Sequence, residues 1–318
     1  MEKATRLKTQ EIKARLLTYN TPRRVVQLLS FLVFSTIIFN LGVLPLVLPV
    51  LWTAGLKGTS IGDAFTTIQL MFSGYSMTST LFPWVALAAF LIVGVLIGRA
   101  LCGWVCPFGF VQDLVGFIRR EQIDVSARTH ETVVYIKYVV LAIAVFIPLL
   151  FSALAFEGIT AYSNTFGVFA VAPFTALSPS DTLFSTVPQA IQSFHFTTFQ
   201  NVGSNFLSGL SALPPLFWVE AVILLIVLIF AVYVPRSWCR YFCPTGAFMA
   251  IMNRFSFIGL RREPFKCEKS GCRECVTVCP MRVPILELQW EKFSHPECIY
   301  CMKCSDACGH RAIKPTYP

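Results

Sequence analysis

All twelve cysteines of this chain fall into four spaced groups. Two groups lie near the C-terminus and follow the spacings C-x4-C-x2-C-x3-C and C-x2-C-x2-C-x3-C. Their members are Cys267, Cys272, Cys275, Cys279, Cys298, Cys301, Cys304 and Cys308. These spacings are typical of a ferredoxin that holds two 4Fe–4S clusters, so they predict one-electron transfer.

The cysteines of such a ferredoxin are shared between the clusters: each cluster takes three thiolates from one motif and the fourth from the other. On this rule cluster 1 takes Cys267, Cys272, Cys275 and Cys308. Cluster 2 takes Cys298, Cys301, Cys304 and Cys279. The first motif departs from the common pattern by its wider first gap, and the second by having Gly309 where a proline is usual.

Two other chemistries use clustered cysteines. A structural zinc site takes four of them, but eight interlocking thiols exceed the need of one such site. Disulfides are disfavoured because neighbours two or three residues apart are poorly placed to pair, whereas tight groups of thiols suit metals.

The remaining four cysteines belong to two copies of the pattern R-x2-C-x3-C-P-x-G, at residues 99–109 and 236–246. The first copy holds Cys102 and Cys106, and the second holds Cys239 and Cys243. In a helix, thiols at i and i+4 share one face, and the next proline would break or kink that helix. The arginine one turn earlier could favour the thiolate form.

Several roles are open for these two C-x3-C-P motifs. The four thiolates could bind a further iron–sulfur cluster or a copper ion, since soft thiolates suit both. They could also form redox-active disulfides. The alternative without function is that small residues pack a helix end. Recurrence of the pattern with its arginine, proline and glycine favours a functional site.

The elements that position these residues are apolar. Only 14% of the 318 residues are charged and 55% are hydrophobic, whereas a soluble domain carries about 25% charged residues. Four stretches are long enough to cross a bilayer as helices, at residues 25–51, 81–101, 133–156 and 216–234. The net charge of +9 does not indicate nucleic-acid binding, because the basic residues flank these stretches instead of forming a stripe.

The basic residues predict the topology. Lysine and arginine are dense before the first stretch, between the second and third, and after the fourth, but none occurs from Tyr138 to Pro235. The positive-inside rule then places both termini, both C-x3-C-P motifs and the ferredoxin segment on the cytoplasmic side of a prokaryotic inner membrane. Residues 1–22 are expected to form a basic helix on the inner leaflet or a solvated tail. Residues 157–215 are expected to form interfacial or re-entrant helices.

The predicted fold has two parts. Residues 1–262 form an all-α integral membrane domain with four transmembrane helices, arranged as two parallel two-helix repeats about a pseudo-twofold axis along the membrane normal. Residues 263–318 form a ferredoxin-like α+β module for two 4Fe–4S clusters. Glu220 lies near the outer end of the fourth stretch, where a solvated residue is expected in preference to a proton acceptor.

This combination resembles the NapH/MauN family of membrane ferredoxins, and parts of it are similar to the C-terminal half of NosR and to CcoG-type proteins. The resemblance extends from Arg23 to Cys308. It implies an electron-transfer subunit of an oxidoreductase that works between the quinone pool and a partner ferredoxin-type or reductase subunit. A quinol dehydrogenase is one form that this activity could take.

Two other functions fit the same residues. In a copper-handling or maturation protein, the C-x3-C-P thiolates would bind copper and the ferredoxin module would reduce it. In a membrane-bound redox sensor, the same cofactors would serve a signalling partner. Metal analysis separates the first of these from respiration, because near-stoichiometric copper lost on substitution of Cys102 and Cys239 would favour maturation.

Overall fold

The computed structural model describes most of the predicted elements. The described residues are 18–38, 52–54, 61–63, 82–119, 123, 125–156, 174, 177–187, 215–267 and 271–317. Most of the N-terminal segment 1–22 and of the outer segment 157–215 therefore lies outside the described residues.

The chain divides into two compact units, and neither is one continuous stretch. Unit 1 comprises Met1–Leu32, Val93–Val111 and Phe248–Pro318. Unit 2 comprises Val33–Ile92 and Gln112–Ala247. The first C-x3-C-P motif thus shares a unit with the ferredoxin segment, and the second motif belongs to the other unit. The predicted domain boundary after residue 262 does not coincide with this division, and it stays a prediction.

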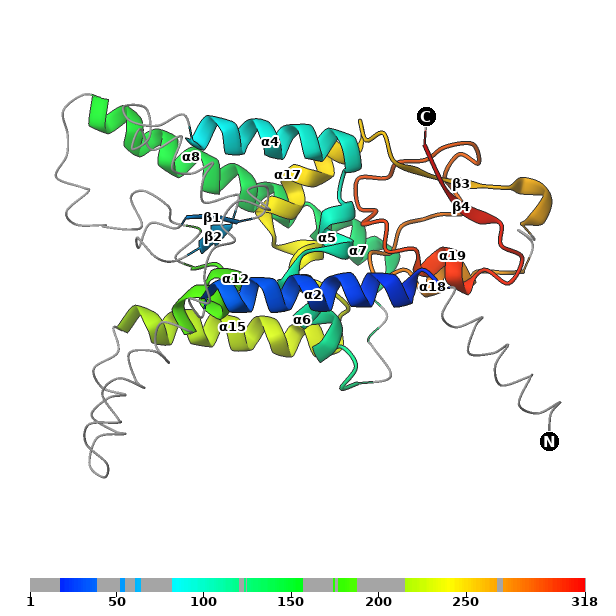
Figure 1. Ribbon diagram of the computed structural model, residues 1–318, viewed down its shortest axis with the longest axis horizontal. Helices are drawn as coiled ribbons and strands as arrows, with labels where there is room; N and C mark the ends of the chain where they lie inside the picture. Colours follow the sequence, from blue (N-terminus) through cyan, green and yellow to red (C-terminus); the bar gives the residue numbers. More distant parts are fainter. Residues whose placement is uncertain are drawn as a thin grey trace. The chain divides into compact units, whose positions relative to one another are not determined.

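Each predicted span coincides at least in part with a helix (Figure 1). The four helices are α2 (Asn20–Ile38), α4 (Phe82–Ile97), α8 (Ile136–Phe156) and α15 (Pro215–Tyr233). Among the residues that the structure describes, two stretches are long and apolar enough to cross a membrane, Arg128–Phe151 and Pro215–Tyr233. The number of four spans stays a prediction, since α4 is short and residues 39–51 are outside the described part.

Large apolar side chains on these helices are exposed in the isolated chain. On α15 they are Val219, Val222, Leu225, Ile226, Ile229 and Phe230. An apolar surface of this extent on a long helix is expected where lipid replaces water as the solvent. Glu220 on the same helix differs from expectation, because it is buried within unit 2 and not solvated at the outer end.

In unit 1, α4 ends earlier than the sequence predicts because of Gly98. Its φ of +55° is readily adopted only by glycine, and its amide donates to the carbonyl of Gly94 at 3.0 Å. The chain then forms the short helix α5 (Ala100–Trp104) and starts α6 (Pro107–Val115). The first C-x3-C-P motif occupies this helical corner.

The C-terminal part of unit 1 is the α+β element of the fold. Strand β3 (Gly259–Arg262) pairs antiparallel with β4 (Ile313–Thr316), in the register Gly259↔Thr316 to Arg262↔Ile313 (Figure 1). Between the strands lie the 3-10 turn η2 (Pro264–Lys266) and the helices α18 (Glu274–Thr277) and α19 (Lys303–Ala307). The pairing closes the segment on itself around a buried apolar core.

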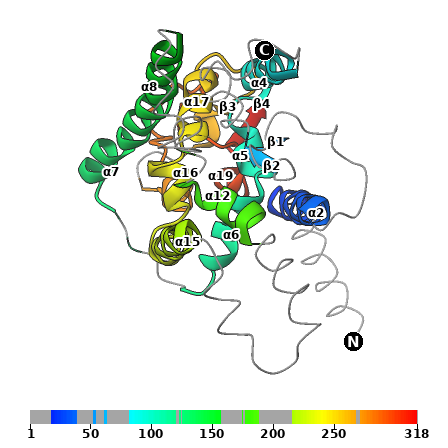
Figure 2. The same ribbon diagram turned by 90° about the vertical axis from the view of Figure 1, so that its left-hand side faces the viewer.

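Unit 2 contains α8 and α15 with shorter elements. These are β1 (Trp52–Ala54), β2 (Ile61–Asp63), α7 (Ala127–Val134), α12 (Pro179–Asp181), η1 (Thr182–Thr186) and α16 (Ser237–Tyr241), and α17 (Pro244–Asn253) starts here and ends in unit 1. β1 and β2 form an antiparallel pair. Figure 2 looks along α15, with α16 beside it. Helix α16 carries the first cysteine of the second motif.

Candidate iron–sulfur sites

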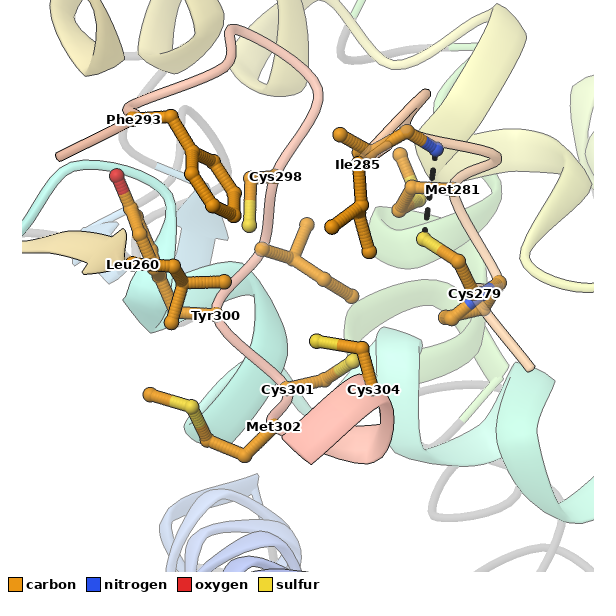
Figure 3. Close-up of a pocket in the computed structure, with 13 residues that line it drawn as sticks. Leu260, Cys279, Met281, Ile285, Phe293, Cys298, Tyr300, Cys301, Met302 and Cys304 are labelled. Carbon is orange, nitrogen blue, oxygen red and sulfur yellow. Dashed lines mark hydrogen bonds between the residues drawn. The ribbon is translucent and has the colours of Figure 1, made fainter. Parts of the chain in front are cut away.

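Four cysteines of the C-terminal segment line one cavity in unit 1. They are Cys279, Cys298, Cys301 and Cys304, the set that the spacing assigns to cluster 2. The other walls are apolar, with Leu260, Val283, Ile285, Phe293 and Ile299 among them. Figure 3 shows the four cysteine side chains on different sides of the cavity, contributed by the turn after α18, by the loop before α19 and by α19 itself.

Burial makes three of these thiols, those of Cys279, Cys298 and Cys304, difficult to ionise without a metal. Burial, with a smaller contribution from the neighbouring thiol of Cys301, raises the pKa of Cys279 to about 11. Burial raises the pKa of Cys298 and of Cys304 in the same way. Thiolates in such a place need compensating positive charge, and bound iron supplies it. The donor set and its apolar walls therefore fit a thiolate-ligated iron–sulfur cluster.

A second group of cysteines gathers around Cys275 at the start of α18. Burial raises the pKa of the Cys275 thiol, and nearby Cys267, Cys308 and Cys272 raise it further. The electrostatic effect of these three thiols on Cys275 places them near it. They are the set that the spacing assigns to cluster 1. The wider gap between Cys267 and Cys272 therefore does not remove either residue from the group.

The turns after the fourth cysteine of each ferredoxin motif have the same geometry. Three residues on, Arg282 has a φ of 54° and Arg311 a φ of 49°. One residue later, the amides of Val283 and Ala312 donate to the sulfurs of Cys279 and Cys308, each at 3.4 Å. Such bonds stabilise thiolate ligands. The replacement of the usual proline by Gly309 leaves this geometry unchanged.

Within the described part of the chain, no three Cys, His, Asp or Glu side chains converge tightly enough to hold one metal ion. A cubane cluster has a different requirement, because each of its four irons takes one thiolate and the cluster itself fills the space between them. Thiols spread over the walls of a cavity meet that requirement.

The C-x3-C-P motifs are not helical through both cysteines, which corrects the expectation from sequence. Helix α5 ends at Trp104 and α16 ends at Tyr241, two residues before Cys106 and Cys243. The reason is the following proline, which disfavours helical geometry in the residue before it and which is well suited to start the next helix. The two cysteines of each motif therefore flank a helix end.

The first motif packs against the ferredoxin loop between Cys298 and Cys301. A Cβ on Gly103 would collide with the backbone carbonyl of Ile299. Next to it, the indole Nε1 of Trp104 donates to the carbonyl of Tyr300 at 2.9 Å. From α2, the side chains of Gln27 and Ser30 donate to the carbonyls of Gly103 and Val105.

Cys102 lies in the same buried core as three of the ferredoxin cysteines. Arg99 also turns toward the ferredoxin segment, because Nη1 of its guanidinium pairs with Glu297 at 2.8 Å. Sequence reasoning placed this arginine beside the cysteines of its own motif. Its charge also acts on Cys298, whose pKa is raised by burial and lowered to a lesser extent by Arg99.

The second motif has its own partners within unit 2. The Gln112 side chain donates to the sulfur of Cys239 at 3.1 Å and accepts from the amide of Trp238 at 3.2 Å. Gly246 donates its amide to the sulfur of Cys243 at 3.3 Å. Arg236 pairs with Asp113 through two hydrogen bonds of 2.9 and 2.8 Å.

A buried histidine adjoins the second motif. The Arg240 guanidinium contacts Nδ1 of His130 through Nε at 3.2 Å and Nη2 at 3.0 Å. Since arginine can only donate, Nδ1 acts as the acceptor, and the ring proton of a neutral His130 belongs on Nε2. Burial raises the pKa of the neighbouring Tyr241, whose hydroxyl lies 3.2 Å from the same nitrogen.

Sequence reasoning did not find Asn253, Glu297, Asp113, Gln112 and His130. Asn253 bonds to both the first motif and the ferredoxin loop. The arginine of each motif was a signal that buried acidic partners exist, because a buried guanidinium requires one. The sequence contains no local signal for which of its acidic residues those partners are.

Comparison with known families places iron–sulfur chemistry on this chain. The family described as a 4Fe-4S binding domain matches residues 79–123 and 216–263. Each matched segment contains one C-x3-C-P motif, and the second ends before Cys267. The match thus falls on the two motifs and their preceding helices, and not on the eight C-terminal cysteines.

Several curated proteins are similar over most of the chain. An uncharacterized protein of Methanocaldococcus jannaschii is 26% identical over 237 residues, which are 73% of this chain and 77% of that protein. The methylamine utilization ferredoxin-type protein MauN of Methylobacillus flagellatus is 24% identical over 258 residues, 79% of this chain and 73% of MauN.

The ferredoxin-type protein NapH of Escherichia coli is 24% identical over 258 residues, which are 78% of this chain and 71% of NapH. No solved structure gives a significant match. The matched 4Fe-4S binding domain and the ferredoxin-type relatives indicate iron–sulfur electron transfer, and the two apolar helices are consistent with association with a membrane. The chain is similar to the NapH/MauN-type ferredoxin-like proteins.

Proposed function

We propose that this chain exchanges electrons between the quinone pool and a partner ferredoxin-type or reductase subunit, as an integral subunit of a prokaryotic inner membrane. The observation that carries the proposal is the cavity with Cys279, Cys298, Cys301 and Cys304 on its walls. Its thiols are buried, surrounded by apolar side chains and supported by a backbone amide, as electron-transfer clusters require. The relatives MauN and NapH, both ferredoxin-type by name, support the same chemistry.

The residues divide between two clusters in this proposal. Cys279, Cys298, Cys301 and Cys304 would hold one, and Cys267, Cys272, Cys275 and Cys308 the other. When bound, each cluster supplies a one-electron couple. The protein contributes the thiolates, the amide donors of Val283 and Ala312, and the apolar walls that exclude water. Those contributions set how readily each cluster is reduced.

The C-x3-C-P thiols Cys102, Cys106, Cys239 and Cys243 would provide further thiolate ligands, as the sequence predicts for a metal site. Iron–sulfur is favoured over copper for this site, because the matched family is described by 4Fe-4S binding and its match contains both motifs. The hydrogen bonds from Gln112 to Cys239 and from Gly246 to Cys243 suit ligands that carry negative charge.

Hydrogen bonds connect the two copies of the repeated motif. Asn253, at the end of the helix after the second motif, accepts from the amide of Arg99 before the first motif. Gln112, in the helix after the first motif, accepts from the amide of Trp238 in the second motif. The contacts run in both directions between the two copies but join positions that are not equivalent in the repeat, so the pseudo-twofold axis rests on the repeated motif itself. The four spans and the cytoplasmic termini rest on the apolar stretches and the distribution of basic residues.

The test is metal analysis and EPR on the intact chain, purified in detergent without oxygen. We expect iron and acid-labile sulfide for at least two clusters, and reduction of the signal-forming centres by a short-chain quinol. Cys275→Ala and Cys304→Ala should each remove a different cluster. Colourless protein with free thiols would refute the proposal. Stoichiometric copper that is lost in Cys102→Ala would instead favour a copper-handling protein.

A further inference from the structure

A buried ion pair lies beside one proposed cluster ligand. Arg99 is fully buried, and its Nη1 donates to Glu297 Oε2 at 2.8 Å and to the carbonyl of Pro296 at 3.2 Å. The Glu297 side chain is only 7% exposed. Glu297 directly precedes Cys298 in the chain. A charge pair of this kind is screened little by solvent, so both charges act at full strength on their surroundings.

The loop that carries this ligand is fixed from three directions. Asn253 Nδ2 donates to the carbonyls of His295 and Cys298, at 2.6 and 3.1 Å. Its Oδ1 accepts from the amide of Arg99 at 3.1 Å. Farther along the loop, Gly103 packs on the carbonyl of Ile299. The ion pair is therefore part of a rigid contact, and its position relative to Cys298 is defined.

We propose that Arg99 and Glu297 form a neutral buried pair that sets the reduction potential of the cluster bound by Cys298. The first C-x3-C-P motif would then tune this cluster through Arg99, whatever its own cysteines bind. The inference rests on the proposed function for the assignment of Cys298 to a cluster. Arg99 and Glu297 are positioning residues in this role, since neither binds the metal.

The sign of the effect follows from charge. Reduction adds one negative charge to the cluster, which a nearby positive charge favours and a negative charge opposes. Glu297→Gln leaves the guanidinium of Arg99 charged and unmatched, because arginine does not lose its proton in proteins. The reduction potential of the cluster should therefore rise in this variant. Arg99→Gln leaves the buried carboxylate unpaired, and at a pH high enough to keep Glu297 ionised the potential of the cluster should fall. The double variant removes both charges and should return toward the wild-type value.

The experiment is an EPR redox titration of the intact chain in detergent. For Glu297→Gln we expect one of the two reduction steps to shift, with about a tenfold higher reduced-to-oxidised ratio at a fixed potential, about 59 mV for one electron. The other cluster serves as the internal reference. Arg99→Gln should shift the same step the opposite way, and the double variant should lie between the two single variants.

Matched controls are Glu291→Gln and Arg254→Gln, which remove one exposed charge of each sign from the same unit. Solvent screens these positions, so neither step should move. The inference is overturned if both clusters form but the single variants shift no step, shift it in the same direction, or shift it no more than their controls. Absence of two clusters in the wild-type chain would instead refute the proposed function. Should one single variant fail to retain its clusters, the other and the double variant still give the sign.

Discussion

The two C-x3-C-P motifs have the same backbone around their cysteines but differ at their arginines, where φ is −79° at Arg99 and 50° at Arg236, and they have different surroundings. In each, the second cysteine donates its amide to the carbonyl five residues earlier, at 2.9 Å from Cys106 to Leu101 and from Cys243 to Trp238. Both arginines are buried and paired with an acid. The partner of Arg99 is Glu297 of the ferredoxin loop, whereas the partner of Arg236 belongs to the helix after the other motif.

A single position within the motif explains much of the difference. The residue after the first cysteine is Gly103 in the first copy and Arg240 in the second. Gly103 leaves room for the carbonyl of Ile299, whereas the side chain of Arg240 donates to His130. Both copies of the pattern therefore form a helix end between their cysteines, and the residues inside each copy determine what it contacts.

The largest expected effect comes from the arginine pair of the second motif. Asp113→Asn leaves the Arg236 guanidinium buried and without its bidentate acid, and both side chains are at most 6% exposed. Breaking a buried pair in this way costs about 3–5 kcal/mol. We expect a lower melting temperature in detergent. The control is Arg236→Met combined with Asp113→Asn, which should recover part of the loss, and equal loss in both variants would contradict the ion-pair explanation.

The next largest effect is expected at Gly103, the glycine by which the first motif differs from the second. Gly103→Ala places a Cβ against the Ile299 carbonyl, so the ferredoxin loop must shift. Overpacking of this kind costs about 1–3 kcal/mol, although alanine in a helix would otherwise gain about 1 kcal/mol over glycine. We expect reduced thermal stability together with loss of iron. Gly309→Ala is the matched control, since nothing lies within 4 Å of its added Cβ. If the Gly103→Ala chain is as stable as that control, the close contact between Gly103 and Ile299 does not distinguish the two motifs.

A smaller effect is expected from substitution of Asn253 or Gln112, whose amide side chains each bond to residues of the other copy of the motif. Asn253→Ala removes three hydrogen bonds, and Gln112→Ala removes two, one of them to sulfur. The buried amide of Arg99, left unpaired, costs about 1–3 kcal/mol, whereas the part-buried carbonyls of His295 and Cys298 cost less, as does a weak contact to sulfur. We expect Asn253→Ala to lower the melting temperature more and to broaden the EPR signal of one cluster. If Gln112→Ala has the larger effect on that signal, the first motif is not the one next to the cluster.

Much of the site could be predicted from sequence because the information is local. Cysteine spacing within a motif reflects one turn of chain wrapped around one cluster, and the order of the fourth ligands follows from the interlocking rule. The apolar stretches could be predicted for a similar reason, because each helix forms its backbone hydrogen bonds within its own segment. Their predicted ends were less accurate, because Gly98 ends α4 four residues before the apolar run does.

The contacts that distinguish the two motifs could not be predicted in this way. Arg99 and Glu297 are 198 residues apart, and Arg236 and Asp113 are 123 apart. Any of the acidic residues could have been the partner as far as local sequence is concerned, because the tertiary fold decides the pairing. One signal was visible, namely the contrast between Gly103 and Arg240 at equivalent positions.

The smallest expected effect concerns an exposed counterpart of the buried pairs. Glu263, beside β3, pairs with Lys266 at 2.7 Å and Lys314 at 2.9 Å, and these bonds lower the pKa of its carboxyl to about 2. A lowered pKa means that the pairing stabilises the fold above pH 4.5 and that this contribution is lost as the pH falls toward 2.

Glu263→Gln should therefore remove a small, pH-dependent contribution to the stability of the fold. We expect wild type to melt slightly higher than the variant at about pH 6, and the gap to narrow by about pH 3.5. At about 1 M salt the gap should also narrow, because the lysines are 53% and 43% exposed and dissolved ions screen exposed charges. A gap as large as that of Asp113→Asn would show that burial is not what makes the motif pairs strong. The contrast between exposed and buried pairs would then lose its physical basis.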